Sequence, residues 1–182
     1  MGIVTVMGID PSLRNTGIAI AFVDTEQNKI EQIIGLSLAR TQPGPKGQRK
    51  SSADYEAALV IRSLIFQKIK EFNPKVVFAE IPSGSQSARG TMSAGIAIGI
   101  MACTQPSPIE VTPQQVKLQS VGIRTETKGE MIEWAVGAYP DAPWHRTTNG
   151  RVMTANEHLA DAVAVIHAGF VTPEWEVIKN LL

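Results

Sequence analysis

Three carboxylates in apolar segments constrain this chain more than any other feature of its sequence. The apolar run 3–9 ends at Asp10, the run 76–79 ends at Glu80, and Asp161 lies inside a helix-like segment that is apolar on nearly every side. An isolated ionised carboxylate is very costly in such surroundings unless it is paired or bound to a metal ion. Each acid is carried by its own apolar element, which suggests a divalent-metal site, and oxygen-rich sites suit Mg²⁺ or Mn²⁺.

The order of the expected elements indicates an α/β fold. Apolar runs rich in β-branched residues predict strands over 3–9, 17–23, 30–39, 75–81 and 108–111. Helical patterns and stop signals predict helices over 53–72, 84–104, 113–121, 127–138 and 155–170. A meander of three strands followed by alternating helices and strands indicates a mixed sheet covered by helices. Because no internal repeat or linker is visible, we expect residues 1–182 to form a single domain.

The composition narrows the class of protein. Seventeen basic and seventeen acidic residues cancel, so net charge selects no partner, but the segment 40–52 has four basic residues and no acid. Its two prolines and two glycines predict an exposed, mobile loop. Cys103 is the only cysteine, which excludes an internal disulfide and fits a reducing compartment. The run 92–103 is shorter than the about 20 apolar residues that span a bilayer. With no signal-peptide start, we expect a soluble, cytoplasmic protein without a membrane anchor.

Two further polar residues precede Asp161 on the last expected helix. Glu157 and His158 lie four and three residues before it, so both can share its face. The segment 154–157, Thr-Ala-Asn-Glu, matches a capping box, which favours a structural role for Glu157, although it can also ligate a metal. His158 has no such local role, and a neutral imidazole can ligate a metal or accept a proton. Structural alternatives remain as well: His158 can be an ordinary core or surface histidine, Asp10 can start a turn, and Glu80 can be a strand-end charge.

These residues resemble a known family. The segment 8–17, Gly-Ile-Asp-Pro-Ser-Leu-Arg-Asn-Thr-Gly, resembles the first-strand motif of the RuvC-type Holliday-junction resolvases of the RNase H-like superfamily. Glu80 matches the family's second acid, at the end of its fourth strand. Lys117 and, eleven residues later, Lys128 resemble two family lysines beside the scissile phosphate. The segment 158–164 resembles the closing helix, where two metal-binding residues are spaced by three.

The resemblance covers nearly the whole chain and implies a fold, an activity and a site. The fold would be an RNase H-like mixed five-stranded sheet with helices on both faces. The activity would be resolution of four-way DNA junctions by paired phosphodiester hydrolysis in a homodimer, with two Mg²⁺ ions per active site and Mn²⁺ as a substitute. The implied metal ligands are Asp10, Glu80, His158 and Asp161. Lys117 and Lys128 would neutralise the phosphate. The segment 83–99 would be the interface helix. Candidate DNA contacts are Arg14, Arg40, Lys46, Arg49, Lys50, Arg89 and Arg124.

The sequence also departs from the family pattern. The family often has an aromatic residue three positions after its second acid, where this chain has Ser83. The first of the paired residues on the closing helix is usually Asp, and here it is His158. The loop 40–52 is longer and more basic than in the bacterial housekeeping type. These departures indicate a divergent branch, such as a phage-encoded one, and leave junction and sequence preference open.

Other functions compete with this interpretation. A broader nuclease that cuts flaps, forks or replication intermediates is the main alternative. A non-catalytic branched-DNA-binding protein on the same fold is a second alternative, although the acids Asp10, Glu80 and Asp161 are retained. The lysine pair disfavours action on RNA–DNA hybrids. A phosphotransferase of the actin and sugar-kinase type is disfavoured because it needs two such domains, and 182 residues hold only one.

Overall fold

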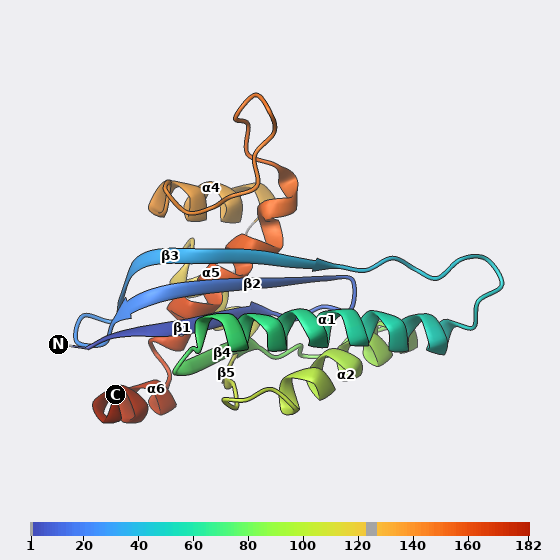
Figure 1. Cartoon of the computed structure of the whole chain (residues 1–182), viewed down its shortest axis with the longest axis horizontal. Coiled ribbons are helices and arrows are strands. Elements are labelled where there is room, and N and C mark those ends of the chain that lie inside the picture. Colours follow the sequence, from blue (N-terminus) through green and yellow to red (C-terminus); the bar gives the residue numbers. More distant parts are fainter. Residues whose placement is uncertain (1, 123–126) are drawn as a thin grey trace.

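The computed structural model describes residues 2–122 and 127–182, and within them five strands form one mixed sheet (Figure 1). The strands are β1 (Ile3–Asp10), β2 (Asn15–Asp24), β3 (Lys29–Arg40), β4 (Val76–Glu80) and β5 (Ile109–Val111). Their order across the sheet is β3-β2-β1-β4-β5. The first three strands pair antiparallel, while β4 is parallel to both β1 and β5. The predicted meander and the mixed five-stranded sheet are therefore confirmed.

Helices cover both faces of this sheet, as predicted. They are α1 (Lys50–Phe72), α2 (Ala88–Ala102), α3 (Pro113–Gln119), α4 (Lys128–Ala138), α5 (Glu157–Gly169) and α6 (Pro173–Ile178). Two 3₁₀ turns accompany them, η1 (Thr154–Asn156) and η2 (Lys179–Leu181). Figure 1 shows α1 and α2 on one face of the sheet and α5 on the other, with α4 beyond α5. The sequence analysis missed α6, although Thr172-Pro173 is a typical helix start.

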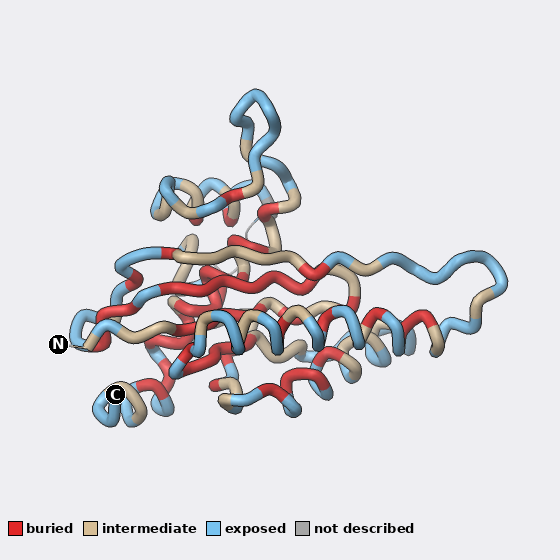
Figure 2. The backbone as a smooth tube through the Cα atoms, in the orientation of Figure 1, coloured by how far each residue is buried: buried red, intermediate tan, exposed pale blue. Residues whose placement is uncertain are grey.

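The core has two parts because side chains alternate across the sheet. Val6 packs with Phe78 and Leu159 on the α5 face, whereas Met7 packs with Ile61 on the α1 face. Figure 2 shows the result as buried backbone along the central strands and exposed backbone in the peripheral loops. The central strands are thus buried on both sides, which explains their nearly continuous apolar sequences.

Two glycines allow α5 to approach the sheet closely. A Cβ atom added at Gly17 on β2 would lie 1.8 Å from the carbonyl oxygen of His158, and one at Gly8 on β1 would lie 2.2 Å from that of Ala162. Only glycine leaves room for such contact between a strand and a helix backbone. This close packing brings the first two turns of α5 against the end of β1, where Asp10 lies.

The polar loop 140–153 projects away from the sheet next to α4, with a bridge between Arg146 and Val152 (Figure 1). Buried Asn156 ties this loop to the start of α5. Its side chain accepts a hydrogen bond from the backbone N–H of His145 at 2.8 Å and donates to the carbonyl oxygens of His145 at 2.7 Å and Met153 at 2.8 Å. Within the described ranges, every helix is too short or too polar to cross a bilayer.

Candidate metal centre

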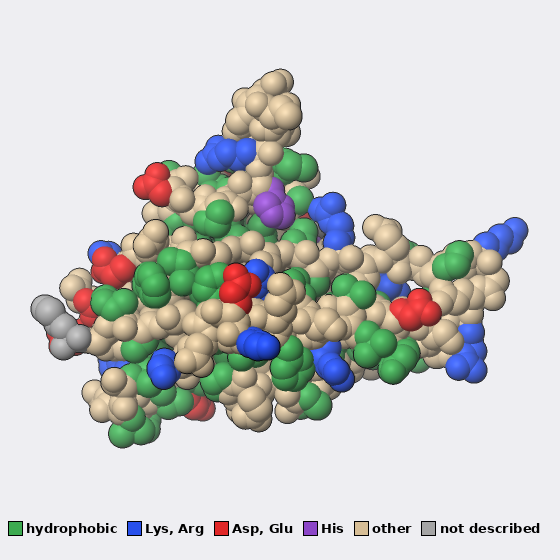
Figure 3. All heavy atoms as spheres, in the orientation of Figure 1, with side chains coloured by type: hydrophobic (Ala, Val, Ile, Leu, Met, Phe, Trp, Pro, Cys, Tyr) green, Lys and Arg blue, Asp and Glu red, His purple; other side chains and the backbone are tan. Residues whose placement is uncertain are grey.

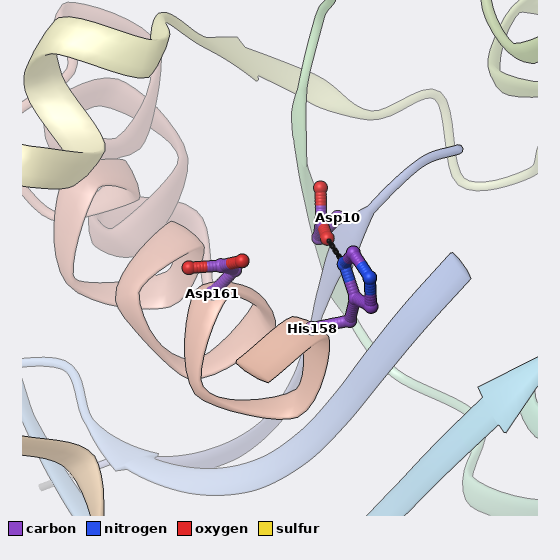
Figure 4. Close-up of side chains that lie close together, drawn as sticks. All are labelled: Asp10, His158 and Asp161. Carbon is purple, nitrogen blue, oxygen red and sulfur yellow. Dashed lines mark hydrogen bonds and ion pairs between the residues drawn. The ribbon is translucent and has the colours of Figure 1, made fainter. Parts of the chain in front are cut away.

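Asp10, His158 and Asp161 meet where β1 ends against α5 (Figure 4). One potential ligand atom from each side chain lies within 4.8 Å of those from the other two. The Nδ1 atom of His158 hydrogen-bonds the Oδ2 atom of Asp10 at 2.9 Å. His158 and Asp161 are three residues apart, so they project from neighbouring turns of the same helix. Two oxygen ligands and one nitrogen ligand therefore converge at one place.

Glu80 joins the same site from the neighbouring strand. The strands β1 and β4 are parallel, and Ile9 on β1 pairs with Ala79 on β4. The residues that follow this pair, Asp10 and Glu80, therefore lie at the same edge of the sheet. A hollow of about 230 Å³, which we call the acidic hollow, lies there. Its charged lining residues are Asp10, Glu80, Glu157, Asp161 and Lys117. Four carboxylates around one small hollow form an environment that favours a cation.

The pKa values of the residues in this cluster also favour a bound cation. Burial, aided by the negative charge of Asp10, raises the pKa of Asp161 to about 8. Burial also raises the pKa of Asp10, although the hydrogen bond with His158 acts to lower it. The same hydrogen bond raises the pKa of His158. Carboxylates crowded this closely resist ionisation because their charges repel and are partly desolvated. A divalent cation would remove that penalty, so the residues present fit Mg²⁺ or Mn²⁺.

The two predicted lysines are placed differently. Lys117, on α3, lines the hollow together with the acids. Lys128 is the first residue of α4, and its neighbours Thr127 and Met131 also line the hollow. The side chain of Lys128 lies outside the part of the chain that the structure describes. Arg124, predicted to contact DNA, also lies outside the described residues.

The predicted capping box at the start of α5 is wrong. Thr154 lies within the 3₁₀ turn η1, and the cap residue of α5 is Asn156, whose side chain makes no capping bond. The 3₁₀ turn moves the helix start beyond Thr154, so Glu157 is the first residue of the helix instead of its third. Glu157 lines the acidic hollow with Asp10, which makes it a ligand candidate together with His158.

The predicted DNA contacts divide into two groups. Arg40 and Arg49 are exposed. The other four described residues, Arg14, Lys46, Lys50 and Arg89, surround a second hollow beside the start of α1. The sequence analysis missed the buried Asp54, which pairs with both Arg14 and Arg89. No local pattern signals it, because its partners lie 40 and 35 residues away in the sequence.

Comparison with known proteins rests on structure. No family model matches this sequence, and no curated protein matches it either. RuvC of T. thermophilus, solved in complex with a Holliday junction substrate, matches with a TM-score of 0.66 and 22% identity over 91% of this chain and 92% of that chain. The yeast mitochondrial Holliday junction resolvase Ydc2 matches with a TM-score of 0.61 and 15% identity, covering 97% of this chain and 80% of its own.

A third solved structure extends the comparison to a virus. The fowlpox virus resolvase, in complex with Holliday junction DNA, matches with a TM-score of 0.52 and 13% identity over 91% of this chain and 96% of that chain. Each of these matches covers 91% or more of this chain, as the sequence motifs predicted. The chain therefore has the RNase H-like fold of the RuvC-type Holliday-junction resolvases.

Proposed function

We propose that this protein is a metal-dependent endonuclease that resolves four-way DNA junctions by paired phosphodiester hydrolysis. The convergence of Asp10, His158 and Asp161 within 4.8 Å carries this proposal, since it provides a cation site at the edge of a resolvase-like sheet. The T. thermophilus and fowlpox proteins of this fold were solved with junction DNA, which supports branched DNA as the substrate class.

Two Mg²⁺ ions would be held in the acidic hollow by Asp10, Glu80 and Asp161. His158 or Glu157 would supply a further ligand, and Mn²⁺ would substitute for Mg²⁺. When bound, such a pair of ions activates water, neutralises charge at phosphorus and assists the leaving oxygen.

The side chains of the chain itself prepare the reaction. Lys117 lines the hollow and would offset the negative charge of the scissile phosphate. Its partner Lys128 is proposed for the same role from the start of α4. Asp10 holds His158 through the 2.9 Å bond, which fixes the imidazole beside the site. In hydrolysis, the oxygen of water bonds to phosphorus, one P–O ester bond breaks, and a proton from the water ends on the leaving oxygen.

Cutting two strands of a junction symmetrically requires two active sites, so we propose a two-fold homodimer. The helix α2 is the proposed interface. It exposes Met92 and Ile98, and a Cβ atom added at Gly95 or Gly99 would meet no atom within 4 Å. An exposed apolar surface with small residues permits close approach of a second copy. Ile98→Glu should therefore convert a dimer into a monomer, measured by light scattering after size exclusion.

One observation favours the broader alternative, a nuclease acting on flaps and forks. Ser83 stands where the resolvases often have an aromatic residue, and it is exposed on the segment between β4 and α2. Without a ring to stack on an unpaired base, selectivity for the branch point would be relaxed.

The deciding experiment offers the protein synthetic four-way junctions, flaps, forks and linear duplex, with and without Mg²⁺. We expect Mg²⁺-dependent cleavage of junctions and little cleavage of duplex. Asp10→Asn should abolish cleavage and keep junction binding, whereas Asp141→Asn, an exposed aspartate outside the hollow, should cleave normally. Substantial nicking by Asp10→Asn would reject the proposed site, and junction binding without cleavage by the wild type would favour a binding protein.

A further inference from the structure

A second hollow, of about 570 Å³, lies beside the start of α1 and has the opposite charge to the metal centre. Its four charged lining residues, all cationic, are Arg14, Lys46, Lys50 and Arg89. Neither an acidic nor an aromatic side chain is among the described residues that line it. Figure 3 shows Lys and Arg side chains at the end of the molecule where the loop before α1 projects. We call this feature the basic hollow.

A buried carboxylate organises the basic hollow. Asp54, on α1, is 2% exposed and accepts hydrogen bonds from both terminal nitrogens of Arg89 and from Nη2 of Arg14 at 2.9 Å. The three residues come from different elements, since Arg14 precedes β2 and Arg89 lies in the first turn of α2. Hydrogen bonds from Arg89 lower the pKa of Asp54, so the carboxylate is ionised at neutral pH.

The arrangement presents positive charge outward. The side chains of Arg14 and Arg89 are 28% and 44% exposed, while Asp54 lies beneath them. Arg14 also donates from Nη1 to Thr41 Oγ1 and to the carbonyl oxygen of Gln42, and Arg89 from Nη1 to the sulfur of Met92. Because a guanidinium group has five N–H donors, these bonds and those to Asp54 still leave donors on both arginines for a second anion. Two arginines and two lysines against one aspartate give the group a net charge of +3. A cluster of ion pairs that only stabilised the fold would not need this excess of positive charge on its solvent-exposed side.

We propose that the basic hollow binds one backbone phosphate of the DNA and that Asp54 is the positioning residue that presents Arg14 and Arg89 to it. Planar guanidinium groups bind phosphate oxygens bidentately, and the absence of aromatic lining excludes base stacking. Arg14 lies on the turn that directly follows Asp10, at the end of β1 where the metal centre lies, so a strand engaged at the metal centre would run toward the basic hollow. The identity of the ligand as DNA rests on the proposed function.

The first test measures junction binding by fluorescence anisotropy in an Asp10→Asn background with EDTA, over a series of salt concentrations. Replacing both Arg14 and Arg89 by Gln should raise Kd about tenfold at 0.1 M salt. It should also reduce the slope of log affinity against log salt by about 0.9, the value for one phosphate. Lys70→Gln, which removes one charge from the far end of α1, should change neither quantity. Wild-type affinity and slope in the double variant would overturn the proposal.

The second test separates positioning from simple attraction, because the two predict changes of opposite sign. Asp54→Asn removes one negative charge and so raises the net charge by one, and bulk electrostatics alone would therefore tighten DNA binding. If Asp54 positions the arginines, Asp54→Asn should weaken binding several-fold despite the added charge. Asp54→Glu, which keeps the carboxylate, should recover part of the loss. Thermal unfolding verifies that each variant is folded, and tighter binding by folded Asp54→Asn would refute the positioning role.

Further arms distinguish failure of this inference from failure of the proposed function. Linear duplex of the same sequence tests the basic hollow without the junction: loss of duplex affinity in the Arg14 and Arg89 variant would support the hollow even if junctions were not preferred. Unchanged affinity in that variant, with normal junction cleavage when the same two replacements are made in the protein that keeps Asp10, would reject the hollow and keep the nuclease. A last arm compares the melting temperature of the wild type in 10 mM inorganic phosphate with that in NaCl of equal ionic strength. If phosphate stabilised the wild type while the variant kept its DNA affinity, the site would bind free phosphate and the proposal would be overturned.

Discussion

Replacing Gly17 by Ala should separate α5 from the sheet and disable the metal centre without replacing any candidate ligand. The new Cβ atom would start 1.8 Å from the carbonyl oxygen of His158, and contacts under 3.0 Å essentially do not occur, so strand and helix must move apart by about 1.2 Å. Overpacking typically costs about 1–3 kcal/mol. Because the obstacle is backbone and cannot rotate away, we expect the free energy of unfolding to fall by about 3 kcal/mol.

The same displacement should impair catalysis. His158 carries the 2.9 Å bond to Asp10, and a misplacement of about 1 Å can reduce a rate about 100-fold. Urea denaturation gives the stability, and single-turnover junction cleavage at 15 °C on the folded variant gives the rate. Gly137→Ala on α4 is the matched control, since its Cβ atom would meet nothing within 4 Å and alanine stabilises helices by up to about 1 kcal/mol. If Gly17→Ala lost less than about 0.5 kcal/mol and cleaved normally, the close packing would not position the site.

Three further predictions concern the residues around α5. If His158 is a ligand, His158→Ala should lose most cleavage activity and His158→Asp recover part of it, while Glu157→Gln keeps activity; the reversed ranking in a cleavage assay would make Glu157 the ligand. Asp161→Asn should raise the stability of the metal-free protein by about 1 kcal/mol, because burial raises the pKa of Asp161 to about 8 and an amide removes the cost of keeping that carboxyl protonated at neutral pH. It should also abolish the rise in melting temperature that we expect Mn²⁺ to give the wild type; a retained Mn²⁺ response would exclude Asp161 as a ligand. His167 hydrogen-bonds Tyr139 at 2.7 Å, and burial lowers its pKa to about 4. Between pH 6.5 and 4, the unfolded chain therefore binds a proton on His167 that the folded protein does not. The free energy of unfolding should therefore fall by about 3 kcal/mol as pH drops through that window, and the fall should be smaller in His167→Gln; equal pH profiles would contradict this assignment.

Local patterns predicted the elements well where packing and propensity agree. The runs that end at Asp10 and Glu80 are strands, and the segment around Asp161 is a helix buried on nearly every side. A local motif also misled: Thr154 to Glu157 has the letters of a capping box, but hydrogen bonds from Asn156 to the preceding loop fix a 3₁₀ turn there. Tertiary bonds outweighed the local capping preference, and they placed Glu157 at the acidic hollow.

The sequence by itself determined the order of the elements and which of them carry acids, because periodicity and the cost of a buried charge are local properties. Only the tertiary structure decided which charges meet. The parallel register of β1 and β4 sets Asp10 beside Glu80, and the absence of a side chain at Gly17 lets α5 bring His158 to them. Asp54 finds its two arginines across gaps of 40 and 35 residues, because folding brings together chain segments that no local pattern links.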